Sequence, residues 1–213
     1  MSQKIFRLLQ RMEKEDLSLQ LALQCAPFLA GLKVSNLLIV PDAWLLHLMR
    51  RLRGTGILVR RLYRNGEKSV LLLYRKEELE RWLTMPEVRR MMVRAGYPSQ
   101  RPEDVLRQLE EKMGSHGKGE MPFPHELGLL LGYPPEDVRG FVEKGGKECS
   151  HTGYWKVYER PEEKRRLFAA FDRATDLAVF LVHKREDVLR LKEIWQKARE
   201  QQRKADAPQR AAG

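Results

Sequence analysis

Cysteine is scarce in this sequence: only Cys25 and Cys149 occur among its 213 residues, and no Cys-x-x-Cys pair is present. A disulfide framework needs several paired cysteines, and a four-cysteine zinc module needs four thiolates. The sequence therefore excludes both classes of protein. Low cysteine use is also typical of a reducing compartment, so we expect a cytoplasmic location.

Long apolar runs are absent as well. No stretch of about 18 uncharged apolar residues, the length of a membrane-spanning helix, occurs in the chain. Residues 1–20 carry charges every few positions instead of the continuous apolar segment of an export signal. We therefore expect neither a membrane span nor an export signal, and no membrane partner.

Acidic residues are missing from residues 44–64, which carry six arginines, and the whole chain has a formal net charge of +11. Such an excess favours a polyanionic partner. The candidate phosphate contacts are Arg50, Arg51, Arg53, Arg60, Arg64, Arg89 and Arg90. Nucleic-acid binding is therefore one functional hypothesis, although no helix-turn-helix, RRM or zinc-finger signature accompanies these arginines. A solvated basic rim is the alternative interpretation, because strand alternation sends Arg60 and Arg61 to opposite faces.

The sequence does contain enough apolar residues, 42%, to bury a core. β-Rich runs on either side of Asn65-Gly66 predict a hairpin over residues 57–75, and residues 34–40 and 154–158 have the composition of further strands. Helical periodicity recurs at 76–84, 86–95, 102–113, 123–131 and 135–144. We predict an α+β fold: a small antiparallel sheet built on the hairpin, covered by several helices, with a long C-terminal helix.

Several boundaries follow from local signals. Residues 17–25 predict a helix that Pro27 interrupts, and the glycine-rich residues 114–120 predict a loop. Residues 177–182 fit either a helix or a strand. We expect residues 1–185 to form a single α+β domain and residues 186–213 a C-terminal helical extension. About the last dozen residues are polar and aperiodic, so we expect a frayed tail without regular structure.

Residues 123–158 hold most of the chemically versatile side chains. His125-Glu126 begins like the zinc motif HExxH, but Leu129 stands where the second histidine would be, which excludes a metalloprotease of that type. Cys149 and His151 are two positions apart, and in an extended segment this spacing points both side chains to one face. With His125 as a third ligand they are the predicted metal ligands, and a transition metal is the cofactor that they would suit. The alternative is that they lie in a surface turn without chemistry.

The same stretch contains residues typical of a small-ligand pocket: His125, Glu126, Tyr133 and Trp155. The alternative interpretation places the aromatic residues in the core or at an interface, and lets His125 help to begin a helix. An enzyme with Cys149 as nucleophile would need an imidazole within reach, an orienting group and an oxyanion pocket, and no complete motif for these is present. The first functional hypothesis is thus a non-catalytic protein that binds a metal or a small ligand near residues 123–158, and the alternative is a nucleic-acid-binding protein.

Four segments together resemble an uncharacterised bacterial family known only as a domain of unknown function. They are CAPFLAGLKVSNL at 25–37, the RNG turn at 64–66, FPHELGLLLGYPPEDVRGFV at 123–142 and KECSHTGYWKVY at 147–158. The resemblance runs from about Leu17 to about Leu181 and implies a single cytosolic domain without an assigned activity. Relatives of this kind tend to carry cysteine at the position of His151, and often at that of Tyr154, so this departure weakens any all-thiolate site.

Overall fold

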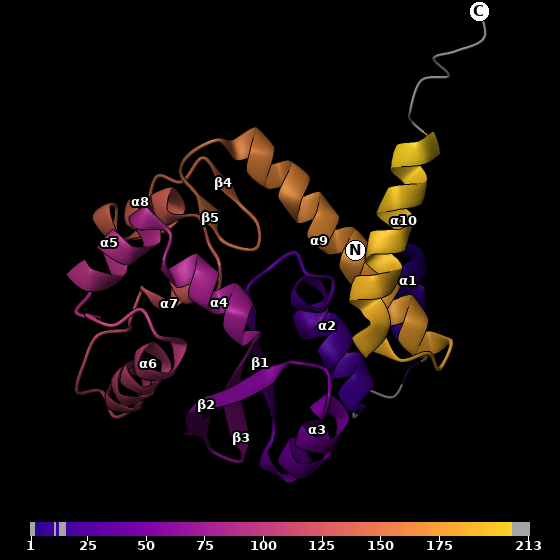
Figure 1. The fold of residues 1–213 in the computed structure, drawn as a ribbon, viewed down its shortest axis with the longest axis horizontal. Helices are drawn as coiled ribbons and strands as arrows, with labels where there is room; N and C mark the ends of the chain where they lie inside the picture. The colour runs from indigo at the N-terminus through magenta and orange to yellow at the C-terminus, as the bar shows by residue number, and fades with distance from the viewer. Residues whose placement is uncertain (1–2, 11, 13–15, 206–213) are drawn as a thin grey trace, which may run out of the picture. The chain divides into compact units, whose positions relative to one another are not determined.

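The computed structural model describes residues 3–10, 12 and 16–205 (Figure 1). The chain divides into two compact units. Lys33–Ala170 form one, here called the sheet unit, and Met1–Leu32 with Phe171–Gly213 form the other, here called the terminal unit. Helix α9 (Pro161–His183) contributes residues to both. The domain boundary expected at residue 185 stays a prediction.

The sheet unit mixes strands and helices. In chain order its remaining elements are β1 (Ser35–Pro41), η1 (Asp42–Trp44), α3 (Leu45–Leu52), β2 (Leu58–Asn65), β3 (Lys68–Tyr74), α4 (Lys76–Leu83), α5 (Pro86–Arg94), α6 (Pro102–Gly117), α7 (Leu127–Leu130), α8 (Pro135–Glu143), β4 (His151–Thr152) and β5 (Lys156–Val157). The predicted α+β fold class is confirmed, with an antiparallel sheet that includes the β2–β3 hairpin.

The three-stranded sheet has the order β1-β3-β2, so the second strand of the hairpin lies in the middle. The strand expected at 34–40 is present as β1 and pairs antiparallel with β3. The segment expected to add a strand at 154–158 does not join this sheet. Its β5 pairs with β4 in a separate two-stranded ladder, because Lys156 and Val157 find their partners only a few residues upstream, in His151 and Thr152.

The hairpin turn lies one position later than the Asn65-Gly66 pair suggests. Asn65 already pairs with Lys68, which leaves Gly66 and Glu67 as the two loop residues. Only Gly66 has a positive φ, +60°. Glycine at the first position of a two-residue loop is typical of the type II′ turn, which matches the twist of the flanking strands.

The core of the sheet unit lies between the sheet and helices α4 to α8. Helix α6 packs on β2, α4 packs on α6, and both α5 and α7 pack on α8. Figure 1 shows these helices, magenta to orange, gathered on one side of the sheet. The buried side chains come from every one of these elements and include Leu62, Leu72, Leu79, Val88, Met92, Tyr97, Val105, Leu109, Leu130 and Val138.

Two helix boundaries differ from the prediction. The helix expected at 123–131 is only the four-residue α7, because Pro124 disfavours a helical backbone at Phe123. Helix α6 in contrast continues through the glycine-rich segment to Gly117, and the chain leaves it at Gly119, whose φ is +77°. Glycine lowers the helical stability of this segment but does not prevent continued hydrogen bonding.

The terminal unit contains α1 (Gln3–Leu9), α2 (Leu17–Leu29), η2 (Val188–Arg190), α10 (Leu191–Ala205) and the second part of α9. Pro27 lies inside α2 and does not end it, although proline removes one N–H donor from a helix and crowds the carbonyl of the preceding turn. The ambiguous residues 177–182 are helical, and they belong to α9. Residues 202–205, expected to lack regular structure, are the end of α10, while 206–213 lie outside the described residues. No helix in the described part of the chain is long and apolar enough to cross a membrane.

Candidate functional site

A hollow of about 470 Å³ opens in the sheet unit within the segment that the sequence analysis singled out. Ring-bearing and aliphatic side chains make up most of its lining, so we call it the aromatic hollow. Its lining is Leu37, Phe123, His125, Leu127, Gly128, Leu131, Tyr133, Asp137, Val138, Phe141, Tyr154, Trp155 and Lys156. The volume and the predominantly apolar lining are those of a small-molecule site.

Trp155 is the most firmly held wall of the aromatic hollow. Its indole stacks on the ring of Tyr133 with 4.7 Å between centroids and an interplanar angle of 26°. The edge of the same indole meets Phe168 at 4.6 Å. Its Nε1 donates a hydrogen bond to Oδ2 of Asp137 at 2.8 Å. Because an indole fixed on three sides loses little further freedom when a ligand arrives, this wall is pre-formed.

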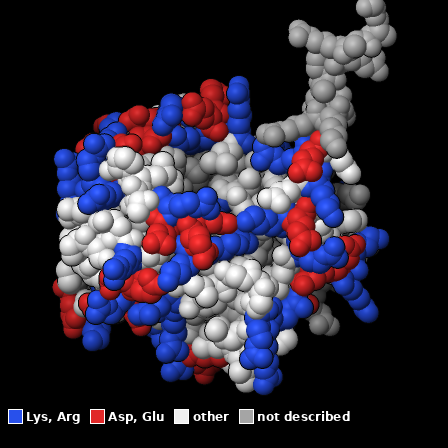
Figure 2. Space-filling view, viewed as in Figure 1, with Lys and Arg blue, Asp and Glu red and all other residues white. Residues whose placement is uncertain are grey.

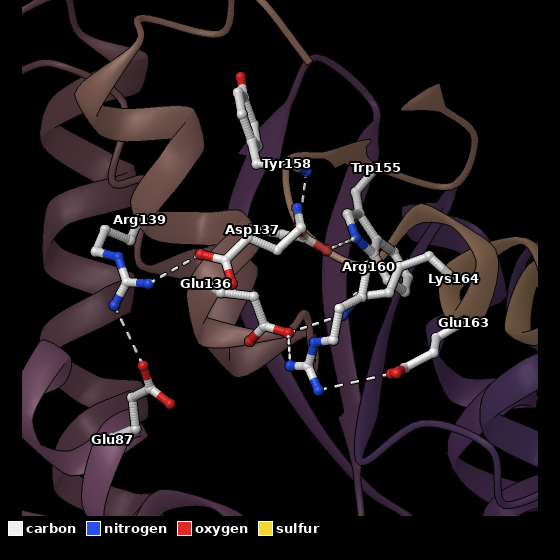
Figure 3. A network of polar contacts seen from close by, with 10 residues as sticks. Glu87, Glu136, Asp137, Arg139, Trp155, Tyr158, Arg160, Glu163 and Lys164 are labelled. Carbon is white, nitrogen blue, oxygen red and sulfur yellow. Dashed lines mark hydrogen bonds and ion pairs between the residues drawn. The ribbon is translucent and has the colours of Figure 1, made fainter. Parts of the chain in front are cut away.

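Asp137 anchors Trp155 and the residues that follow β5 to helix α8 (Figure 3). Besides the indole, its carboxylate accepts hydrogen bonds at Oδ1 from the backbone N–H groups of Tyr158, at 2.8 Å, and Glu159, at 3.2 Å. The side chain is buried, with 2% of the residue exposed. A buried carboxylate whose two oxygens accept three N–H groups is satisfied, so Asp137 shapes the hollow and is not free to bind a ligand.

The neighbouring Glu136 ties α8 to the start of α9. Its Oε1 accepts from Lys164 Nζ at 2.7 Å and also pairs with Arg160. Lys164 and Glu136 are both buried, with side-chain exposures of 6% and 7%. Burial acts to raise the pKa of Glu136, but the hydrogen bonds and charge of Lys164 and Arg160 outweigh it and leave the pKa below its ordinary value.

Arg139 of α8 forms ion pairs with two other parts of the chain (Figure 3). One guanidinium nitrogen lies 3.3 Å from Glu87 on α5, and another lies 3.3 Å from Glu159. These ion pairs are partly exposed, and each contributes little stability by itself. Together with Asp137 and Glu136 they hold α5, α8 and the segment after β5 in one arrangement around the hollow.

His125 and Lys156 are the basic groups of the aromatic hollow. The imidazole of His125 is exposed and lies between two phenyl rings, with centroid distances of 5.8 Å to Phe123 and 5.2 Å to Phe141. Lys156 donates from Nζ to the carbonyl oxygen of Gly146 at 2.6 Å. An imidazole and an ammonium at the edge of an apolar hollow can orient the polar part of a ligand.

A second hollow, about 650 Å³, lies between α5, α8 and the segment before α7. Because three arginines line it, we call it the arginine hollow. Its lining is Glu87, Arg90, Met91, Arg94, Ala95, Pro122, Phe123, His125, Glu126, Leu129, Val138, Arg139, Val142 and Glu143. Phe123, His125 and Val138 line both hollows, so the two meet along these side chains.

The four predicted ligand-binding residues are divided between the hollows. His125, Tyr133 and Trp155 line the aromatic hollow, whereas Glu126 lines the arginine hollow. The carboxylate of Glu126 accepts from Lys112 Nζ at 2.7 Å and is largely buried. Glu126 therefore fastens the segment before α7 to α6.

Lys112, the ion-pair partner of Glu126, makes two further contacts. Its ammonium lies 4.2 Å from the ring centroid of Tyr97 and donates to the carbonyl oxygen of Ala95 at 2.7 Å. Burial, with the nearby charge of Glu126, raises the pKa of Tyr97. The phenol therefore stays neutral, and the cluster of Tyr97, Lys112 and Glu126 contributes to the packing of the protein.

The three predicted metal ligands, His125, Cys149 and His151, are not gathered into one group. No group of three or more His, Cys, Asp or Glu side chains that could hold a metal ion is found among residues 3–10, 12 and 16–205. Cys149 contacts the hydroxyl of Thr152, with 3.4 Å between Sγ and Oγ1, and the ring of His151 lies 6.1 Å from that of Phe168. His125 packs instead against Phe123 and Phe141. The spacing of Cys149 and His151 in the sequence could not reveal that their neighbours are a hydroxyl and a phenyl ring.

The predicted phosphate contacts are distributed over α3, β2 and α5. Arg60 and Arg64 form ion pairs with Glu110 and Asp42. Arg50 and Arg53 border a third hollow at the end of α3, Arg51 lies beside them in the last turn, and Arg89 and Arg90 are exposed on α5. On the face drawn in Figure 2, Lys and Arg are interspersed with Asp and Glu.

Sequence reasoning missed part of the lining of the aromatic hollow. Phe123, Phe141 and Lys156 flank the predicted residues in sequence, and their aromatic or amphipathic character was the available signal. Leu37 carried no such signal, because it comes from β1, far upstream. Its place in the lining depends on the pairing of β1 with β3.

The comparisons with known proteins give one match. Residues 21–192 match the model of the family described as a protein of unknown function, DUF3793. The comparison with curated proteins found no match, and neither did the comparison with solved structures.

Proposed function

The chain belongs to the DUF3793 family, and we propose that it binds a small, largely apolar ligand in the aromatic hollow without transforming it. The observation that carries the proposal is the hollow itself: about 470 Å³, lined mainly by rings and aliphatic side chains, with a few polar groups at its edge. Three of its lining residues, His125, Tyr133 and Trp155, are predicted ligand contacts. The ligand class that fits is a planar aromatic or aliphatic molecule of modest size.

The rigidity of the wall supports binding. Trp155 is held by Tyr133, Phe168 and Asp137, and the residues after β5 are held by two backbone hydrogen bonds to Asp137. A wall that is already ordered avoids the entropy cost of ordering side chains on binding. Phe123 and Tyr154 in contrast are 41% exposed each, so a ligand that covers them would remove apolar surface from water.

An uncharged fluorescent probe, N-phenyl-1-naphthylamine, tests the proposal. Its emission increases in apolar surroundings, so a titration measures its dissociation constant. We expect saturable binding at one site, and an affinity loss of about tenfold in Phe123→Ala and in Tyr154→Ala, because each removes one ring from the wall.

The matched control is Phe180→Ala, which removes a ring of similar exposure, 37%, from α9 in the terminal unit. We expect this variant to bind the probe like the unaltered protein. Absence of saturable binding, or equal losses in all three variants, would contradict a ligand site in the aromatic hollow.

Nucleic-acid binding is the second candidate function, and one observation favours it. The hollow bordered by Arg50 and Arg53 contains no acidic residue in its lining, so a phosphate there would meet no repelling carboxylate. A salt series with mixed RNA and DNA tests it, with Arg50→Gln/Arg53→Gln as the variant. This function requires affinity that falls steeply with salt, and a smaller slope in the double variant. No binding at low salt removes the candidate.

A further inference from the structure

We infer that the ligand is an amphipathic acid, whose apolar body occupies the aromatic hollow and whose anionic group lies beside Arg90 and Arg94 in the arginine hollow. The inference rests on the proposed function and adds the chemical class of the ligand: an apolar ring system or chain that ends in a carboxylate, sulfonate or phosphate.

The first step is the junction of the two hollows. Phe123, His125 and Val138 line both, so a ligand seated against the rings of the aromatic hollow can pass these side chains into the arginine hollow. His125 and Phe123 are exposed side chains. These two side chains can therefore change rotamer without disturbing the core, which would open a way between the hollows.

The second step is the balance of charge in the arginine hollow. Two of its carboxylates are already paired, Glu87 with Arg139 at 3.3 Å and Glu126 with Lys112 at 2.7 Å. Within the part of the chain that the structure describes, Arg90 and Arg94 have no ion-pair partner, and Glu143 is the remaining unpaired carboxylate of this lining. The uncompensated charge is therefore positive, which favours an anion over a cation.

The third step is the geometry of the arginines. Arg90 and Arg94 are four positions apart on α5, and residues with this spacing lie on one face of a helix. Guanidinium groups bind carboxylate and phosphate oxygens through paired N–H donors, and such charge-assisted bonds are stronger than neutral ones. Two of them side by side in a hollow that borders the aromatic hollow suit a single anionic head group.

The charged and basic groups of the aromatic hollow also favour an anionic ligand over a cationic one. Its one carboxylate, Asp137, is occupied by three N–H donors, so it cannot attract a cationic ligand. The basic groups of its lining are Lys156 and His125, which can donate hydrogen bonds to an anion. Among the described residues that line the two hollows, Glu143 is therefore the one carboxylate without an ion-pair or hydrogen-bond partner.

Two probes that differ in one group test the inference. N-phenyl-1-naphthylamine is uncharged, and 8-anilinonaphthalene-1-sulfonate has the same ring system with a sulfonate. We expect the sulfonate to bind more tightly, and Arg90→Gln and Arg94→Gln each to lower its affinity about tenfold while the affinity of the uncharged probe changes less than about twofold. The matched control is Arg89→Gln, an exposed arginine on the same helix that lines neither hollow, and it should leave both affinities unchanged.

The outcomes separate this inference from the proposed function. If the uncharged probe does not bind, the proposed function fails. If it binds but the sulfonate gains nothing, or Arg90→Gln and Arg94→Gln act no more strongly than Arg89→Gln, the acid class is overturned while the ligand site stands. If Lys156→Gln alone removes the advantage of the sulfonate, the anionic group lies at the other end of the aromatic hollow, and the assignment to Arg90 and Arg94 is wrong.

Discussion

Trp155 and Asp137 are joined by a buried hydrogen bond of 2.8 Å, from the indole Nε1 to Oδ2, although 18 positions separate them in the chain. The bond connects a wall of the aromatic hollow to the first turn of α8. Because the indole also stacks on Tyr133, one contact orders two of the rings that line the hollow. The shape of the candidate site therefore depends on a carboxylate that a ligand cannot reach.

We expect Asp137→Asn to lower the free energy of unfolding by about 2 kcal/mol, because the amide presents N–H donors where the carboxylate accepted them and leaves a buried donor unsatisfied. Urea denaturation measures the change. Trp155→Phe removes the partner, so the double variant should lose less than the sum of the single losses. Additive losses would show that the two side chains do not interact.

Gly140 allows α8 to approach Tyr158. A Cβ at this position would lie 2.5 Å from Cγ of Tyr158, so we expect Gly140→Ala to destabilise the protein by about 1–3 kcal/mol despite the higher helix propensity of alanine. Gly114 in α6 is the matched control, since a Cβ there meets nothing within 4 Å. Gly114→Ala should stabilise the protein by up to about 1 kcal/mol. Equal shifts of the melting temperature in the two variants would contradict the close contact with Tyr158.

Glu136 should make stability depend on acid pH. Its pKa is lowered in the folded protein, so its contribution is complete above the ordinary glutamate pKa of about 4.3 and is lost as the pH falls through the folded value. We expect Glu136→Gln to cost about 3 kcal/mol at pH 7, because Lys164 is left buried without its counter-ion. Urea denaturation from pH 7 to pH 3 should show the difference between the two proteins narrowing below about pH 4. A difference that stays constant over this range would contradict the ion pair.

Glu126 tests the distinction between a residue that holds the site and one that contacts the ligand. We expect Glu126→Gln to lower the free energy of unfolding by about 1 kcal/mol, because Lys112 loses its charged acceptor. The affinity for uncharged N-phenyl-1-naphthylamine should stay within about twofold, since Glu126 does not line the aromatic hollow. A large loss of affinity with unchanged stability would instead make Glu126 a ligand contact.

Much of the candidate site could be anticipated from residues near one another in the chain. His125, Tyr133 and Trp155 lie within one segment of 36 residues, and all three line the same hollow. The metal hypothesis used the same segment and stays a prediction: no group of three or more potential metal ligands is found in the part of the chain that the structure describes, where Cys149 and His151 lie beside Thr152 and Phe168. Spacing in a strand indicates which side chains share a face, but it does not indicate what the face meets.

By itself, the sequence determined the local structure: the hairpin at Gly66, the proline-started helices α5, α6 and α8, and the α+β class. These depend on backbone conformations that glycine and proline restrict or permit within a few residues, and on the period of the apolar side chains. Only the tertiary structure decided that Leu37 lines the aromatic hollow and that this hollow shares lining residues with the arginine hollow. It also decided that Asp137 accepts a hydrogen bond from Trp155 and that Glu126 pairs with Lys112. These relationships join residues from separate elements, and packing and buried hydrogen bonds, which are not local to the chain, select them.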